Sequence, residues 1–276
     1  MDPSSLPSDT VQWWTAVRRQ LRFYLRTWRF VGLLIFVMVV TTAFTALSIY
    51  YGDSGASANS YLYGVINSLP TFGIIIGAFI GGDAIAMDFG SGTGYFMLVL
   101  PVRRVVLLLG RYAAAFLASF ALILVYYAYA IAGASWFYGL GGLPWLDVAE
   151  SIGLAALFAL AVLATAFLFS AFFRSPAISI VVTILVLFLA FTILDGAIAV
   201  TGVEPFFSLP YSGGVLALVF QSAPHHVISS VASGRARITI HTWNPYIWEG
   251  VVIMLVYLGV GLGLSSALYQ YKESKG

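Results

Sequence analysis

The chain has 276 residues, of which 61% are hydrophobic and only 9% are charged, and its net charge is +2. A soluble protein of this length could not bury so much apolar surface, so the composition predicts a polytopic membrane protein and leaves no long polar segment for a soluble catalytic domain. Cysteine is absent, which excludes disulfide bonds and metal sites built from thiolates.

The N-terminal residues predict an amphipathic helix that lies on the membrane surface. At about 100° per residue, a face of Trp, Tyr and Leu is followed by a face of arginines, namely Arg18, Arg19, Arg22, Arg26 and Arg29. This pattern is typical of an interfacial helix whose basic side faces anionic head groups. We therefore expect a helix over residues 9–29. It is either a lipid anchor only or an elbow helix that also contacts a cytosolic partner.

Six apolar segments are long enough to cross a bilayer, whose core requires about 20 apolar residues per helix. They are predicted at residues 31–50, 69–87, 105–134, 151–173, 177–203 and 247–271. The predicted fold is all-α, with a single transmembrane domain over residues 1–276. On span two, Gly73, Gly77 and Gly81 recur every four residues, a small-residue face that lets another helix approach closely.

Two of the predicted connections between spans are described by their composition. Residues 51–67 are rich in Gly, Ser and Asn and are predicted to form an outer loop. The turn Arg174-Ser175-Pro176 is very short, so spans four and five are predicted to form a tight hairpin.

A polar segment at residues 88–104 separates spans two and three. In order it carries an acid, a glycine-rich run, an apolar turn, a proline and two arginines: Asp88, Gly90–Gly94, Tyr95–Leu100, Pro101 and Arg103-Arg104. It lacks the Lys-Ser/Thr ending of a P-loop and follows a membrane helix rather than a strand, which argues against nucleotide binding. With Thr93 as its N-cap, Tyr95–Leu100 is predicted to begin a short surface helix that Pro101 limits.

The segment 204–246 is the longest stretch predicted between two spans. Its apolar part, Val215–Phe220, is too short to cross a membrane, and a second amphipathic piece reaches about Ser233. Two short re-entrant helices that dip into the outer leaflet would bury these residues. An ordinary external loop is the alternative.

The distribution of basic residues predicts the orientation of the chain. Of the 13 Lys and Arg residues, only Arg235 and Arg237 fall on one side of the predicted membrane. The others share the opposite side: Arg18, Arg19, Arg22, Arg26, Arg29, Arg103, Arg104, Arg111, Arg174, Lys272 and Lys275. Because cytoplasmic loops carry the excess of Lys and Arg, the sequence predicts a multi-pass cell-membrane protein with both termini in the cytosol.

Two acids lie within the predicted spans, where an ionisable side chain is by default a functional candidate. Asp83 is near the cytosolic end of span two, where its carboxylate would reach cytosolic water or pair with Arg103. Asp195 lies towards the outer third of span five. It either lines the outer part of a translocation path or bonds to a neighbouring helix.

The three histidines, His225, His226 and His241, are all predicted on the outer side. No acid lies at a ligand spacing near them, and adjacent histidines seldom chelate one ion together, so no metal site is predicted. The sequence also carries no catalytic set at a defensible spacing. Neither an enzyme active site nor a nucleic-acid partner is therefore expected.

The region from residue 88 to residue 111 resembles the ABC-2 type permeases of ABC exporters. The shared order is an acid, Gly-Thr, a Leu-x-x-Pro-x-Arg-Arg motif and a Gly followed by a basic residue, found here at Asp88, Gly92, Thr93, Leu98, Pro101, Arg103, Arg104, Gly110 and Arg111. The family usually has Glu at the first of these positions and Lys at the last, and this chain has an additional Gly94. An elbow helix, six spans and re-entrant helices before span six also have counterparts, so the resemblance covers essentially the whole chain.

The resemblance implies the transmembrane subunit of a type V exporter, without catalysis or a cofactor of its own. It would work as a dimer with a second copy and with two cytosolic ATPase subunits, which bind ATP and Mg. Residues 88–101 would form the coupling helix that sits in a groove on the ATPase, and the residues named above from Asp88 to Arg104 would make or anchor that joint. Spans one and five form the dimer contact in the family, which would place Asp195 close to the path.

Two other classes of function are alternatives. A stand-alone secondary transporter or channel predicts several intramembrane charges and helices broken at the midplane. An intramembrane enzyme or assembly factor requires a polar catalytic set at one depth. The sequence shows neither pattern clearly. The scarcity of charges in the spans favours a lipidic, amphipathic or hydrophobic substrate.

Overall fold

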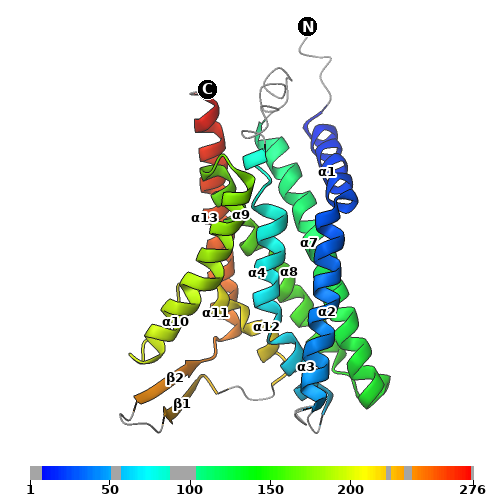
Figure 1. Ribbon diagram of the computed structural model, residues 1–276, viewed down its shortest axis with the longest axis vertical. Coiled ribbons are helices and arrows are strands. Elements are labelled where there is room, and N and C mark those ends of the chain that lie inside the picture. The colour runs from blue at the N-terminus through cyan, green and yellow to red at the C-terminus, as the bar shows by residue number, and fades with distance from the viewer. Residues whose placement is uncertain (1–7, 51–56, 88–103, 222–224, 233–237, 275–276) are drawn as a thin grey trace.

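The computed structural model of the protein describes residues 8–50, 57–87, 104–221, 225–232 and 238–274 (Figure 1). Within these residues, six helical segments are long and apolar enough to cross a membrane: Trp28–Leu47, Ala58–Gly81, Val105–Tyr138, Trp145–Phe172, Pro176–Ala199 and Ile247–Tyr271. The protein is therefore a multi-pass membrane protein with six candidate spans, as the sequence predicts. We number these spans one to six in chain order.

The elements of the described residues follow one another as a mainly helical bundle. In chain order they are α1 (Asp9–Arg26), α2 (Trp28–Tyr50), α3 (Ala58–Ile66), α4 (Leu69–Gly81), α7 (Arg104–Tyr138), η2 (Leu140–Gly142), α8 (Trp145–Phe172), α9 (Pro176–Ile184), η3 (Leu185–Ala190), α10 (Phe191–Ala199), α11 (Leu209–Gly213), α12 (Val215–Leu218), β1 (Val227–Ala232), β2 (Ile238–Trp243) and α13 (Ile247–Ser274). Helix α1 and the C-terminal end of α13 lie at one end of the bundle, and the two strands lie at the other (Figure 1).

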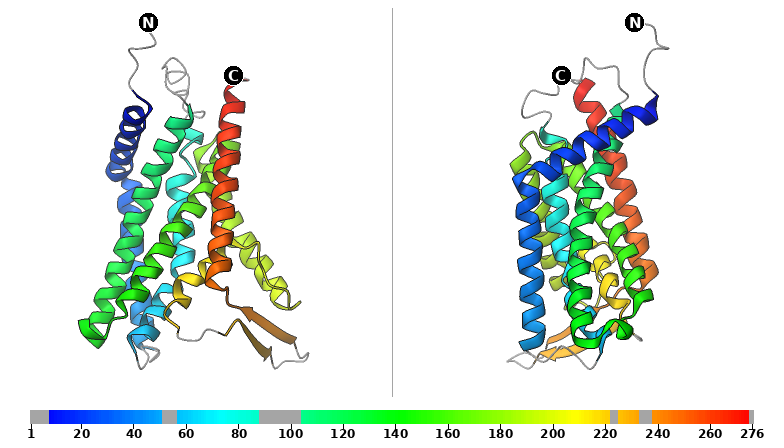
Figure 2. Two further views of the ribbon diagram at one scale, coloured as in Figure 1. Left: turned by 180° about the vertical axis from the view of Figure 1, so that it is seen from behind. Right: turned by 90° about the vertical axis from the view of Figure 1, so that its right-hand side faces the viewer.

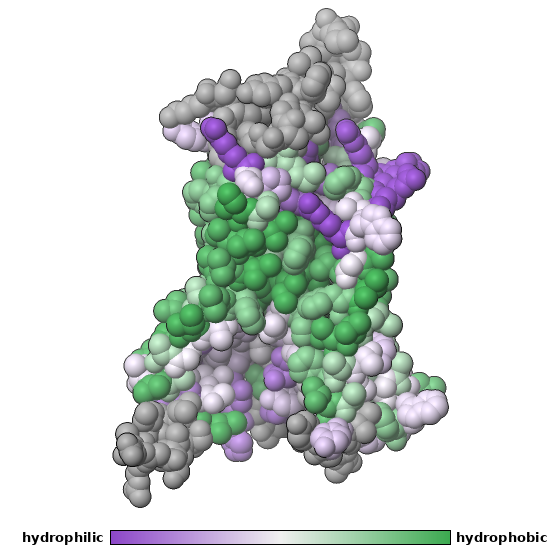
Figure 3. All heavy atoms as spheres, in the orientation of Figure 1, coloured by the Kyte–Doolittle hydropathy of each residue, from purple (hydrophilic) through white to green (hydrophobic). Residues whose placement is uncertain are grey.

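Helix α1 is separated from span one by a break at Thr27, whose backbone is extended. It lies obliquely across the end of the bundle (Figure 2) and buries Val17 and Tyr24. The predicted helix over 9–29 therefore ends at Arg26, and Arg29 belongs to α2. A space-filling view shows apolar residues over the middle of one face and hydrophilic residues gathered where α1 lies (Figure 3).

Spans two, three and four form the buried centre of the bundle, whereas spans one, five and six expose more of their apolar surface. The glycine face of α4 packs on α8. A Cβ atom on Gly73, Gly77 or Gly81 would lie 3.1, 2.5 or 2.9 Å from a side chain of α8, in turn that of Phe158, Val162 and Ala166. The predicted close approach of a second helix to this face is confirmed.

Span two is longer at its N-terminal end than the sequence indicates. The predicted outer loop over 51–67 is wrong for its last part, because Ala58–Ile66 forms α3, with Ser57 accepting a hydrogen bond from the Ser60 N–H at its N-terminus. Tyr61, Leu62 and Val65 are fully buried. At the other end, α4 stops at Gly81 rather than at residue 87.

Span five consists of α9, the π-helix η3 and α10, with no break in the helical ribbon. It follows α8 after a turn of only a few residues, so the predicted hairpin of spans four and five is confirmed. A π-helical segment is rare and is frequently found at functional sites.

The segment between spans five and six differs from the prediction in its second half. Its first half forms two short apolar helices, α11 and α12. The second forms an antiparallel hairpin of β1 and β2, in which Val227 pairs with Trp243, so the prediction of a second amphipathic helix here is wrong. The reason lies in the partner strand β2, in which four of the six residues, Ile238, Thr239, Ile240 and Thr242, are β-branched and therefore favour a strand over a helix.

Candidate functional site

The residues that the sequence proposes for coupling lie between α4 and α7. Asp88, Gly92, Thr93, Leu98, Pro101 and Arg103 are outside the described residues, as is the side chain of Arg104, which begins α7. The structure does describe the chain on both sides of this segment. These flanking residues determine how a displacement of the segment would reach the spans.

The chain enters the segment after a turn that begins with a half-buried ion pair. Asp83 is only 3% exposed, and its carboxylate accepts a hydrogen bond from the guanidinium of Arg29 on α2. Burial raises the pKa of the Asp83 carboxyl to about 6, and the charge of Arg29 opposes that rise. Of the two expectations for Asp83, contact with water is wrong, because the residue is buried. Its described partner is Arg29, and pairing with Arg103 stays a prediction because Arg103 lies outside the described residues.

The same turn is held by two further helices. The hydroxyl oxygen of Ser170 on α8 accepts hydrogen bonds from the backbone N–H groups of Ile85 and Ala86, both 2.9 Å long. The guanidinium of Arg111 on α7 donates to the carbonyl oxygen of Ala84 at 3.2 Å. Residues 83–86 are therefore tied to α2, α7 and α8 at once.

The chain leaves the segment into α7, which packs closely against α1. A Cβ atom on Gly110 would lie 2.8 Å from the Cβ atom of Ala16 and 3.2 Å from the carbonyl oxygen of Trp13. Glycine is therefore required for this crossing of α1 and α7. Entry and exit of the segment are both anchored on helices at the same end of the bundle.

Asp195, the candidate for the translocation path, lies on α10 near the C-terminal end of span five. One of its carboxylate oxygens accepts a 2.7 Å hydrogen bond from the hydroxyl of Ser208, the residue that caps α11. Its other oxygen is buried without a hydrogen-bond partner among the described residues. Asp195 therefore joins span five to the short helices that follow it, rather than to a neighbouring span.

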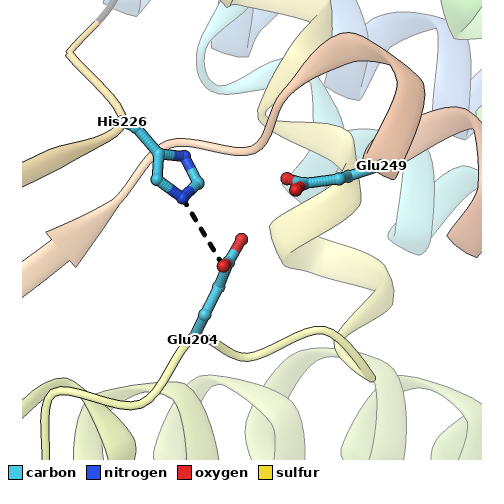
Figure 4. Close-up of side chains that lie close together, drawn as sticks. All are labelled: Glu204, His226 and Glu249. Atoms are coloured by element: carbon cyan, nitrogen blue, oxygen red, sulfur yellow. Dashed lines mark ion pairs between the residues drawn. The ribbon is translucent and has the colours of Figure 1, made fainter.

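A second polar group, which sequence reasoning missed, lies at the end of the bundle where the two strands are found. Glu204 follows α10, His226 precedes β1 and Glu249 is in the first turn of α13 (Figure 4). One potential ligand atom from each lies within 4.8 Å of the others, and Nε2 of His226 is 3.5 Å from Oε2 of Glu204. The three residues are far apart in sequence, so no local spacing could reveal them.

The surroundings fix the orientation of each member of this group. Nδ1 of His226 is 2.8 Å from the carbonyl oxygen of Asn244, and its ring stacks on that of Tyr246 with centroids 4.3 Å apart. The hydroxyl of Tyr211 donates to Oε1 of Glu204. Burial, and then this contact with Glu204, raises the pKa of Tyr211, so its hydroxyl remains a donor. The backbone N–H of Tyr246 donates to Oε2 of Glu249 at 3.0 Å.

Comparison with known protein families gives a match. A family model described as a protein of unknown function (DUF2705) matches residues 53–209, a range that includes the segment between α4 and α7, Asp195 and Glu204 but ends before His226. No curated protein matches the chain in sequence. Because the family match covers more than half of the chain, the protein belongs to the DUF2705 family of proteins of unknown function.

Proposed function

We propose that the protein is the transmembrane permease subunit of an ABC exporter of the ABC-2 type. Two copies would form the translocation path in the cell membrane, with their termini in the cytosol, and two separate ATPase subunits would bind ATP and Mg and supply the energy. The resemblance of residues 88–111 to such permeases motivates this proposal. The observation that carries it is the anchoring of both flanks of residues 88–103 on helices α1, α2, α7 and α8.

Coupling to a separate motor requires that a displacement be passed on rather than absorbed. A flexible loop between two spans would absorb it, whereas an element whose ends are tied to several helices moves those helices with it. Here side chains of three helices, α2, α7 and α8, hold residues 83–86 by hydrogen bonds. A load applied to the segment by an ATPase would therefore reach spans one, three and four together.

Helix α1 fits the role of the elbow helix in this scheme. Its Trp13 and Trp14 side chains are exposed beside buried Val17, and exposed Trp residues favour the membrane–water interface. Because α1 contacts the first turns of α7, it lies where it would share the motion of the coupling segment. This gives it a mechanical role in addition to anchoring.

Spans one and five have features that suit a translocation path between two copies. Spans one and five expose apolar side chains along their length, among them Ile35, Val39, Val181 and Leu185, and a second copy would cover such faces. Span five also contains the π-helix and, beyond it, Asp195. In our proposal α11 and α12 are the re-entrant helices that close the outer end, with Ser208 linking them to Asp195.

Co-purification from native membranes tests this function. We expect an ATPase subunit in a one-to-one ratio with the permease, and its loss when Leu98 is changed to Ala together with Arg103→Glu. Arg235→Glu, the same charge reversal on the opposite side of the predicted membrane, is the matched control and is expected to retain the ATPase. Gradient-driven transport by the protein purified alone, without any ATPase, would instead establish the stand-alone transporter or channel.

A further inference from the structure

Glu204, His226 and Glu249 combine the donor atoms of a metal site. One imidazole nitrogen and carboxylate oxygens from two residues are ligands that Zn²⁺ accepts in proteins, at about 2.0–2.2 Å. We propose that these three residues form a divalent-cation site, best suited to Zn²⁺, which joins the outer ends of span five, the β-hairpin and span six. The site is independent of the proposed export function.

The tautomer of His226 favours a metal. A carbonyl oxygen can only accept a hydrogen bond, so the 2.8 Å contact with Asn244 requires the proton of a neutral ring to lie on Nδ1. The lone pair of Nε2 is then directed at Oε2 of Glu204, 3.5 Å away. A backbone carbonyl that fixes one nitrogen while the other faces the ion is the usual outer contact of a metal-binding histidine.

The charges of the three side chains also favour a bound cation. Glu204 is 9% exposed at its side chain and Glu249 is 9% exposed, so two carboxylates are brought together with little water. Even a protonated His226 offsets only one of the two negative charges. A dication that binds all three ligands compensates both carboxylates and leaves the imidazole neutral.

The geometry requires only a small adjustment. Ligands of a tetrahedral zinc ion at about 2.0–2.1 Å lie roughly 3.3 Å apart, close to the 3.5 Å that already separates His226 Nε2 from Glu204 Oε2. All three atoms lie within 4.8 Å of one another, so a change of side-chain rotamer, without movement of the backbone, would complete the set. Since His226 remains 23% exposed, water can occupy a fourth position, and ions can enter from the outer side.

Hydrogen bonds orient the carboxylates without using all of their lone pairs. Glu204 accepts from the hydroxyl of Tyr211 and Glu249 from the N–H of Tyr246. Each oxygen of a carboxylate has two acceptor positions, so both residues retain capacity for an ion. The hairpin adds rigidity, because Asn244 also donates to the carbonyl oxygen of His226 through its backbone N–H at 2.9 Å.

Metal analysis of the full-length protein tests this site. The protein is purified with a tag that contains no histidine, stripped with a chelator, exposed to Zn²⁺ and passed through a desalting column before elemental analysis. We expect close to one zinc ion per chain, and a rise in thermal unfolding temperature on adding Zn²⁺ because the ion binds only the folded arrangement. His226→Ala, Glu204→Gln and Glu249→Gln should each lose the bound ion, weakening binding by more than the roughly 10–100-fold that loss of an outer contact costs.

His225→Ala is the matched control. His225 is adjacent in sequence and exposed, and its known contact is made by its backbone carbonyl oxygen, so this variant should retain the ion and the thermal shift. Two results would overturn the proposal: a wild-type protein that holds no stoichiometric Zn²⁺ after desalting, or a loss of zinc in His225→Ala equal to that in His226→Ala. The first result would leave His226 and Glu204 as an ion pair only.

Discussion

The carboxylate of Asp83, at the end of span two, is paired with the guanidinium of Arg29, in the first turn of span one. The two partners differ greatly in environment: the side chain of Asp83 is 4% exposed and that of Arg29 is 53% exposed. Loss of the arginine therefore leaves a buried carboxylate without its cation, whereas loss of the aspartate leaves an arginine that water can solvate. This asymmetry gives the first prediction.

Arg29→Met should destabilise the protein more than Asp83→Asn does. We expect Arg29→Met to lower the free energy of unfolding by about 1–3 kcal/mol, a range between those of exposed and fully buried ion pairs. Combining it with Asp83→Asn should restore part of this stability. Thermal unfolding in detergent measures the effect. Arg26→Met is the control, because Arg26 is exposed on α1 and no ion pair of it is described; an equal loss of stability in that variant would contradict the prediction.

The cost of Arg29→Met should also depend on pH. With Arg29 present, the pKa of Asp83 is about 6, above its ordinary value of 3.8. The folded state therefore binds the proton more tightly than the unfolded state, and this group's contribution to stability falls as pH rises from about 4 to about 6. Without Arg29 the pKa of Asp83 rises further, so the loss of stability that its ionisation causes continues to higher pH. Unfolding temperatures of both proteins at pH 5 and pH 8 should show the larger difference at pH 8, and an unchanged difference would contradict this account.

Ser170→Ala should loosen the turn that precedes the coupling segment. It leaves the N–H groups of Ile85 and Ala86 buried without their acceptor. An unsatisfied buried group lowers the stability of the fold by about 1–3 kcal/mol. Ser119→Ala is the control, since the hydroxyl of Ser119 is buried without a partner among the described residues and its removal should be neutral or stabilising. Thermal unfolding measures both variants. If the proposed function is correct, Ser170→Ala also lowers transport per ATP hydrolysed.

Tyr211→Phe should weaken zinc binding without removing a ligand. Glu204 loses the donor that orients its carboxylate, and loss of such an outer contact costs about 10–100-fold in metal affinity. Competition with a fluorescent zinc chelator measures the affinity. Tyr257→Phe is the control, because that hydroxyl donates to the carbonyl oxygen of Phe207 and touches none of the three ligands; a similar loss there would indicate general damage to the outer end.

The spans could be predicted from the sequence because each depends on a property that is local along the chain. Long apolar runs identified all six, and the repeat of Gly73, Gly77 and Gly81 predicted a close helix contact without naming α8 as the partner. The first half of span two was missed. Its Gly, Ser and Asn residues look like a loop, but Tyr61 and Leu62 are buried against the bundle, and this packing outweighs the local preference.

The polar contacts of the site could not be predicted, because they join residues that no sequence period connects. Asp83 reaches Arg29 only because α2 and α4 lie in one bundle, and Arg29 itself was assigned to the surface helix. Two short helices separate Glu204 from His226 along the chain, and the hairpin separates His226 from Glu249. The sequence predicts a short helix up to about Ser233 where β1 is found, so it does not reveal that a hairpin brings His226 to the two carboxylates.

The π-helix of span five changes which way its outer half faces. Each of its hydrogen-bonded turns contains one residue more than an α-turn, and one residue corresponds to about 100° around the axis. A helical wheel drawn through Pro176–Ala199 as one regular α-helix would therefore assign α10 to the wrong sector, although it describes α9 well. The direction in which Asp195 meets Ser208 consequently depends on the π-helix that precedes it as well as on the face that α9 turns to the bundle.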